Sequence, residues 1–117
     1  MEEQPIFIRV LGNSPKIRIL NYLIKVRGMD FSMSDIARNS GVGWATLNRL
    51  WAGFVDTRVV AMTRIVGRAK LYKLNEENTA VKDLIEMYKK LLVQETEGEF
   101  KKQKMEIVCD AKKIRQL

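Results

Sequence analysis

Apolar residues recur every three or four positions in the first quarter of the chain, which is the spacing of a helix face. A short apolar stretch after Pro5 predicts a first helix that ends at Gly12. A second helix is predicted to begin at Ser14 and Pro15, because serine is a favoured N-cap and proline a favoured first helical residue. Gly28 indicates the end of this helix. Its core-facing positions are Ile17, Ile19, Leu20, Leu23 and Ile24.

Two short helices with a tight turn between them are predicted in the middle of the chain. The run from Ser32 to Asp35 has the form of a capping box, a hydroxyl followed three residues later by a carboxylate. The helix that it opens is broken at Ser40-Gly41, where glycine permits a turn conformation that other residues adopt only at a cost. The next helix runs from about Trp44 to Phe54. Short helix, glycine turn and short helix together form a helix-turn-helix pattern.

The pattern changes from helix to strand after Val59. Residues 59–65 are rich in β-formers, and residues 70–74 alternate apolar and polar side chains with a period of two. Residues 66–69 predict the turn between them, so this part of the chain is expected to form a β-hairpin with a basic tip. Residues 29–31 favour no more than a stub of strand. A hairpin directly after a helix-turn-helix predicts a winged helix, a mainly α fold with a small β-hairpin.

A strongly amphipathic helix is predicted after the hairpin, with Asn78 as its N-cap. Its helical pattern fails at residues 95–99 around Gly98, and residues 100–114 predict one more, weaker helix. We therefore expect a winged helix-turn-helix domain with its terminal helix over residues 1–94. A basic C-terminal extension, residues 95–117, is expected to follow it.

Composition narrows the function. The chain has 117 residues, enough for one domain, and its hydrophobic fraction of 46% suits a globular core. It contains no histidine, which removes the usual general base, the common nucleophile pairs and most transition-metal sites. We therefore expect a protein that is not an enzyme and that binds no metal and no cofactor. The one cysteine, Cys109, is expected to be an unreactive thiol in a reducing compartment.

Positive charge is concentrated in the helix-turn-helix and the hairpin. The net charge of the chain is +7, and residues 31–75 contain seven basic and two acidic residues. Residues 76–98, by contrast, contain three basic and six acidic residues. A surface that meets an anionic partner is therefore expected in the middle segment. No apolar run approaches the length of a membrane span, and the acidic N-terminus lacks signal-peptide features, so we expect a cytoplasmic, nucleoid-associated protein without a membrane partner.

Three parts of the sequence resemble winged-helix repressors of the ArsR type. Residues 11–20 (LGNSPKIRIL) are similar to the family's first-helix signature, and residues 34–37 (SDIA) with 40–42 (SGV) to its second helix and turn. Residues 67–75 (GRAKLYKLN) are similar to its wing. The resemblance spans roughly residues 6–92 and implies a homodimeric DNA-binding transcriptional regulator whose terminal helices form the dimer interface. Metal sensors of this family use cysteine and histidine ligands, which this chain lacks, so metal sensing of that type is not expected.

The face of the helix from Trp44 that lies opposite its apolar residues is the expected recognition surface for double-stranded DNA. Arg49 is suited to bidentate contact with guanine, and Asn48 to adenine. Trp44 is open to two interpretations, packing on a sugar or base and plugging the turn. The alternative for the whole face is an ordinary solvated surface. The expected recognition residues are Trp44, Ala45, Thr46, Asn48 and Arg49.

Basic side chains on the hairpin and the preceding helix are the expected backbone contacts. Arg68 at the hairpin tip is the preferred contact to phosphate or minor groove, with Arg64 and Lys70 beside it. Lys16 and Arg18 are expected to approach the DNA backbone from the helix that begins at Ser14. The alternative is that these charges only keep exposed elements soluble.

The apolar stripe of the last predicted helix is long for the small body that it covers. Part of it is therefore expected to pack on a second copy of the chain, joined by the N-terminal stretch. The expected interface residues are Ile6, Phe7, Val10, Val81, Leu84, Ile85, Tyr88, Leu91 and Leu92.

Together these features favour a sequence-specific DNA-binding transcriptional regulator, with one helix in the major groove and a wing on phosphate or minor groove. Two alternatives remain open. In a winged-helix protein-interaction module, reversing the charges of the recognition face and wing tip would have no effect. In a non-specific architectural chromatin protein, the lysines of the C-terminal extension would matter more than Arg49.

Overall fold

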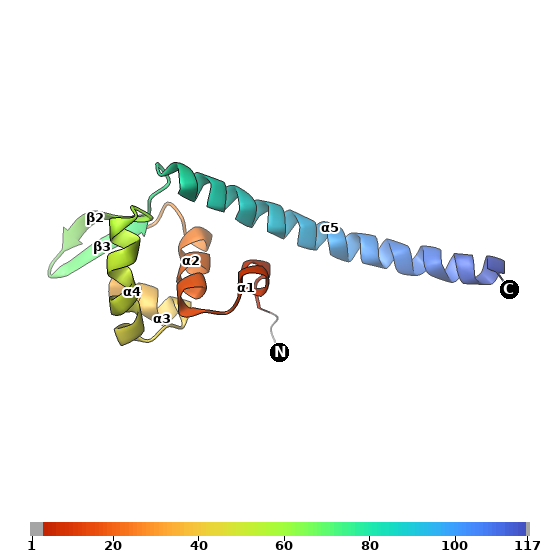
Figure 1. Cartoon of the computed structure of the whole chain (residues 1–117), viewed down its shortest axis with the longest axis horizontal. Coiled ribbons are helices and arrows are strands. Elements are labelled where there is room, and N and C mark those ends of the chain that lie inside the picture. Colours follow the sequence, from red (N-terminus) through yellow and green to blue (C-terminus); the bar gives the residue numbers. More distant parts are fainter. Residues whose placement is uncertain (1–3, 117) are drawn as a thin grey trace.

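Four short helices and a small sheet form one body, and a long last helix extends away from it (Figure 1). The computed structural model of the chain describes the backbone of residues 4–116 and the side chains of residues 4–98. Its elements in chain order are α1 (Ile6–Leu11), α2 (Pro15–Lys25), β1 (Phe31–Ser32), α3 (Met33–Ser40), α4 (Trp44–Asp56), β2 (Val60–Val66), β3 (Ala69–Leu74) and α5 (Thr79–Gln116).

Helices α2 and α3 begin at the serine caps that the sequence predicted. The Ser14 hydroxyl accepts a hydrogen bond from the amide of Ile17 at 3.2 Å, with Pro15 as the first residue of α2. The Ser32 hydroxyl accepts one from the amide of Asp35, also at 3.2 Å, and starts α3. Local capping chemistry therefore fixes where both helices begin, as the sequence predicted.

The sheet has three antiparallel strands in the order β1-β3-β2, so β2 is an edge strand. The hairpin is tighter than predicted, because Val66 pairs with Ala69 and only Gly67 and Arg68 remain in the turn. Gly67 has a φ of +62°, which suits the first central position of a two-residue hairpin turn. The predicted stub of strand is β1, which pairs Phe31 with Tyr72.

One apolar core joins the helices to the sheet. Trp51 of α4 lies against Tyr72 of β3, with ring centroids 5.2 Å apart, and against Phe54 at 5.8 Å. This aromatic contact holds α4 against the base of the hairpin. The largest fully buried side chains of the described residues are Phe7, Ile19, Leu23, Ile24, Ile36, Leu47, Leu74 and Val81.

Helix α5 is longer than the sequence pattern predicted. Its N-cap is Asn78, as expected, whose side-chain oxygen accepts a hydrogen bond from the amide of Ala80 at 2.9 Å. The helix then continues through Gly98 without the predicted interruption. One glycine inside a helix costs only about 1 kcal/mol, and the glutamates and lysines around it are good helix formers. The proposed boundary at residue 94 stays a prediction.

Two further findings concern the described part of the chain. No helix there has both the length and the apolar content needed to cross a bilayer. No three of its Cys, Asp or Glu side chains lie together in a way that could hold a metal ion. Cys109 and the lysines of the C-terminal extension lie outside the residues whose side chains are described.

Candidate nucleic-acid interface

A three-residue turn sets helix α4 across helix α3. Gly41 ends α3 in the left-handed conformation, with a φ of +71°, and its amide bonds back to the α3 carbonyls. Val42 follows and is buried, with its amide donating to the carbonyl of Ala37 at 3.0 Å. Gly43 then caps α4. The turn is therefore plugged by Val42, and not by Trp44, whose side chain is 53% exposed.

Helix α4 has one buried face and one free face. Leu47, Trp51 and Phe54 are buried in the core. On the other side, four of the five residues predicted to recognise DNA are exposed, and the fifth, Thr46, is half-buried. The exposed four are Trp44, Ala45, Asn48 and Arg49.

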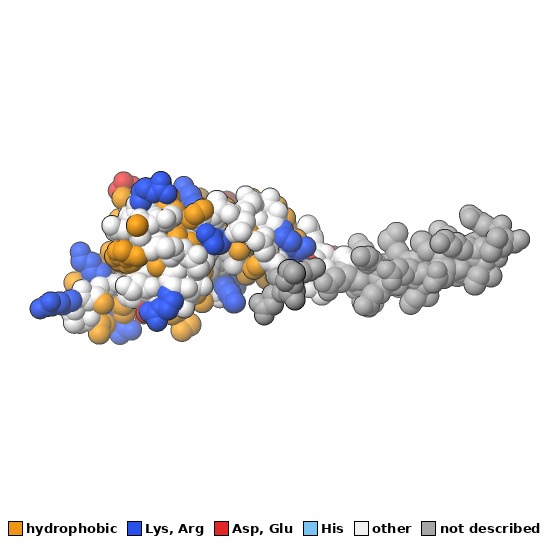
Figure 2. Space-filling model, turned by 90° about the horizontal axis from the view of Figure 1, so that it is seen from below, with side chains coloured by type: hydrophobic (Ala, Val, Ile, Leu, Met, Phe, Trp, Pro, Cys, Tyr) orange, Lys and Arg blue, Asp and Glu red, His pale blue; other side chains and the backbone are white. Residues whose placement is uncertain are grey.

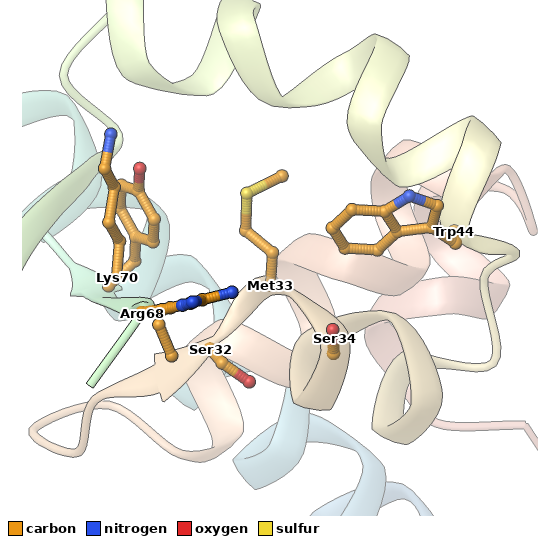
Figure 3. Close-up of a pocket in the computed structure, with 8 residues that line it drawn as sticks. Ser32, Met33, Ser34, Trp44, Arg68 and Lys70 are labelled. Carbon is orange, nitrogen blue, oxygen red and sulfur yellow. The ribbon is translucent and has the colours of Figure 1, made fainter. Parts of the chain in front are cut away.

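A shallow concavity of about 300 Å³ lies between the start of α4 and the tip of the hairpin. Figure 3 shows Trp44 on one side of it and Arg68 on the other, with the Met33 side chain rising between them. Ser34 and Lys70 also line it. The structure therefore brings the predicted recognition helix and the predicted wing to one continuous surface.

Three cations of this surface have no ion-pair partner among the side chains that the structure describes. Neither Arg68 nor Lys70 forms an ion pair with a residue whose side chain the structure describes, and the same is true of Arg49. All three are exposed. In Figure 2, Lys and Arg side chains lie across the end of the molecule that holds the hairpin and α4, with apolar side chains between them. Such a surface attracts a polyanion.

Arg64 differs from the other predicted wing residues because it is paired. Its guanidinium bonds to both carboxylate oxygens of Asp30, through Nε at 3.1 Å and through a terminal nitrogen at 3.3 Å. The Thr63 hydroxyl donates to the same carboxylate. The Arg64 guanidinium, followed by the Thr63 hydroxyl, holds the pKa of Asp30 below its ordinary value. Nothing in the sequence indicated this cluster, because Asp30 lies just before β1 and only the folded sheet brings it to Thr63 and Arg64, which are neighbours on β2.

Lys16 and Arg18 lie on α2, where Lys16 is near the end of α4 and Arg18 is near the turn between α3 and α4. The Lys16 ammonium is 5.8 Å from the ring centroid of Phe54, and the lysine is otherwise exposed. Arg18 is half-buried, and one of its terminal nitrogens lies 4.0 Å from the position that a Cβ on Gly41 would occupy. Arg18 therefore lies beside the turn itself.

The predicted dimer residues divide between the core and the surface. Phe7 packs on Tyr88, with ring centroids 5.5 Å apart, and both are buried within the chain. Val81 and Ile85 are buried as well. Ile6, Leu84 and Leu91 are half-buried, while Val10 and Leu92 are exposed by 54% and 41%.

Two neighbours of the exposed pair were not predicted. Leu11 follows Val10, and Val93 follows Leu92, and both are more than two-fifths exposed. An ion pair between Arg9 and Glu95 ties α1 to α5 beside them. We call Val10, Leu11, Leu92 and Val93 the apolar strip.

Comparison with known proteins finds solved structures that resemble this chain in fold. No protein-family model matches the chain, and no curated protein matches its sequence. A mutant of Lactococcus lactis ZitR in apo form is 15% identical, with a TM-score of 0.61 over 82% of this chain and 76% of ZitR. The S. aureus MepR–DNA complex is 16% identical, with a TM-score of 0.58 over 85% of this chain and 79% of that one.

The description of a third similar structure states its architecture. Mb0332 from Mycobacterium bovis, described as a homodimeric winged helix-turn-helix DNA-binding domain of a possible ArsR-family regulator, is 17% identical. Its TM-score is 0.53, over 80% of this chain and 81% of that domain. The chain has the winged helix-turn-helix fold. In this fold α3 and α4 are the helix-turn-helix and the β2–β3 hairpin is the wing, as the sequence predicted.

Proposed function

We propose that the protein is a transcriptional regulator that binds double-stranded DNA. The observation that carries the proposal is the concavity that Trp44 at the start of α4 shares with the wing cations Arg68 and Lys70. The exposed face of the same helix also presents Asn48 and Arg49. The start of α4 would enter the major groove, and the wing tip would lie on the adjacent backbone or minor groove. The match to a winged-helix protein solved with DNA supports this arrangement.

Each free side chain has a distinct role in this proposal. Asn48 and Arg49 contact base edges, because their amide and guanidinium groups match adenine and guanine in the major groove. Arg68 and Lys70 contact phosphates. Arg64 supports the wing through Asp30 and contributes less to DNA attraction, since its charge is already compensated.

The apolar strip supports a homodimer. Four apolar side chains on α1 and α5, two helices that the Arg9–Glu95 ion pair joins, are exposed in the single chain. Burying them against a second copy would remove them from water. Mb0332, of the same fold, is described as homodimeric. Two copies would place two α4 helices on half-sites about one helical turn apart and bind a pseudo-palindromic sequence.

Selection of bound duplexes from a random library tests this function. The proposal predicts enrichment of a sequence with two related half-sites, and binding that weakens steeply as salt increases. A protein-interaction module would enrich nothing. A non-specific architectural protein would bind without enriching a sequence. Either result would overturn the proposal.

A further inference from the structure

The tip of the wing carries exposed apolar side chains as well as cations. Ile65 is 58% exposed and Val66 is 53% exposed, directly before the turn of Gly67 and Arg68. Figure 1 shows the hairpin projecting from the body at the end opposite the C-terminus of α5. Nothing in the described part of the chain covers these two side chains.

Their place in the sheet makes this exposure costly. Strand β2 is an edge strand, and edges usually carry charges that discourage other strands from pairing with them. Here the two residues nearest the tip are β-branched and apolar. An apolar pair at a protruding edge therefore points to a partner that covers it.

The surrounding charges identify the chemistry of that partner. Ile65 pairs with Lys70 across the hairpin, so the two side chains share one face of the wing, and Lys70 lines the concavity beside α4. Arg68 stands free at the turn. Val66 pairs with Ala69 and so lies on the opposite face from Ile65, which leaves one apolar side chain on each face of a tip that carries two cations. Such a tip fits a narrow groove with anionic walls and a less polar floor, which describes the minor groove of DNA.

We propose that Ile65 and Val66 enter the minor groove beside each half-site and favour a deformable base step there. This inference rests on the proposed DNA-binding function. Apolar side chains in the minor groove partly unstack a base step and bend the duplex. Pyrimidine–purine steps such as TA yield most easily to such bending, whereas A-tracts are stiff. The expected preference is therefore for TA steps at the wing contact.

Two flanks with the same A·T content test the inference, because a wing that acts only through arginine makes the opposite prediction. A-tracts have the narrower groove and the stronger negative potential, which attract arginine. Entry of Ile65 and Val66 predicts binding about tenfold tighter to a half-site flanked by TA steps than to one flanked by an A-tract. It also predicts a bend, measured by energy transfer between dyes at the ends of the duplex.

The variant Ile65→Thr/Val66→Thr removes the apolar surface but keeps the β-branched shape that suits a strand. It is expected to bind both flanks equally and to bend the duplex less, with no change in the salt dependence because no charge is altered. Val55→Thr, at an exposed position near the end of α4, is the matched control and is expected to keep the flank preference.

Four results would overturn the inference. Tighter binding to the A-tract, or a TA preference that survives in the double variant, would exclude entry of these side chains while leaving DNA binding intact. If the double variant differed in molar mass from the unmodified protein and kept the flank preference, a second copy of the chain, and not DNA, would be what covers the tip. Failure of the unmodified protein to bind any duplex would instead overturn the proposed function, and this inference with it.

Discussion

Arg64 and Arg68 lie four residues apart on one hairpin, yet they meet different surroundings. Arg64 is held by both oxygens of Asp30, and Arg68 is free at the turn. A cation that already has a carboxylate partner adds little attraction for phosphate, whereas a free one adds its full charge. The two arginines are therefore expected to differ in their effect on DNA binding, although the sequence alone treats them alike.

Replacing Arg68 by alanine is expected to weaken binding to all duplexes alike and to lower the slope of affinity against salt by about one. Arg64→Ala is the comparison, and its slope should change less. Fluorescence anisotropy titrations at several salt concentrations measure both slopes. Equal changes in the two variants would contradict the difference inferred from the Asp30 pairing.

The Asp30 carboxylate makes a pH-dependent contribution to stability. Because its pKa is lowered in the folded chain, the contribution is present above the ordinary aspartate pKa of about 3.9 and is lost as the pH falls through the lower folded value. The free energy of unfolding of Asp30→Asn should therefore fall less between pH 5 and pH 2 than that of the unmodified protein. Urea titrations across that range test this, and parallel pH profiles would contradict it.

At the scale of elements, the turn between α3 and α4 decides how the proposed recognition helix is presented. Gly41 adopts a left-handed conformation that residues with a Cβ rarely adopt, so the angle between the two helices depends on it. Gly53 lies inside α4, and a Cβ added there would meet no atom within 4 Å beyond its chain neighbours and the backbone of its own helix. The two glycines therefore form a matched pair for mutation.

Gly41→Ala is expected to destabilise the fold by about 1 kcal/mol, because alanine is strained at this φ. Gly53→Ala is expected to stabilise it by about 0.5–1 kcal/mol, since alanine is the better helix former. Urea denaturation gives both free energies of unfolding. The same sign for both changes would show that the turn conformation is not what requires glycine at position 41.

How well each element could be predicted from the sequence depends on how far apart along the chain its interacting residues lie. Ser14, Ser32 and Asn78 act on amides two or three residues away, so the helix starts were predictable. The contact of Phe7 with Tyr88 joins distant parts of the chain and removes both side chains from the predicted dimer surface. The helix was wrongly predicted to be interrupted at Gly98. A single glycine is a poor helix former, but it does not stop a helix whose neighbouring residues favour helix formation.

At the scale of the whole molecule, one end of the body has the cationic surface and the other has the apolar strip. The strip lies on α1 and α5, and the wing projects at the opposite end (Figure 1). A second copy bound at the strip would leave both cationic surfaces free. The arrangement therefore allows dimerisation and DNA binding to occur together.

Placing charges in the strip tests the dimer. Val10→Glu/Leu92→Glu is expected to give a folded monomer, because burying two carboxylates in an apolar contact is unfavourable. Val55→Glu, on exposed α4 surface away from the strip, is the control and should stay dimeric. Sedimentation velocity measures the molar mass. A charged strip that leaves the dimer intact would contradict this interface.

In the proposed complex, α4 and the wing contact one duplex together, through its major and minor grooves. Dimethyl sulfate footprinting on a selected sequence tests both contacts at once, because the reagent methylates guanine N7 in the major groove and adenine N3 in the minor groove. We expect protected guanines within each half-site, with the protection lost in Arg49→Ala. We also expect protected adenines beside them, with the protection lost when the wing tip is altered. Unprotected guanines and adenines on a duplex saturated with the protein would contradict it.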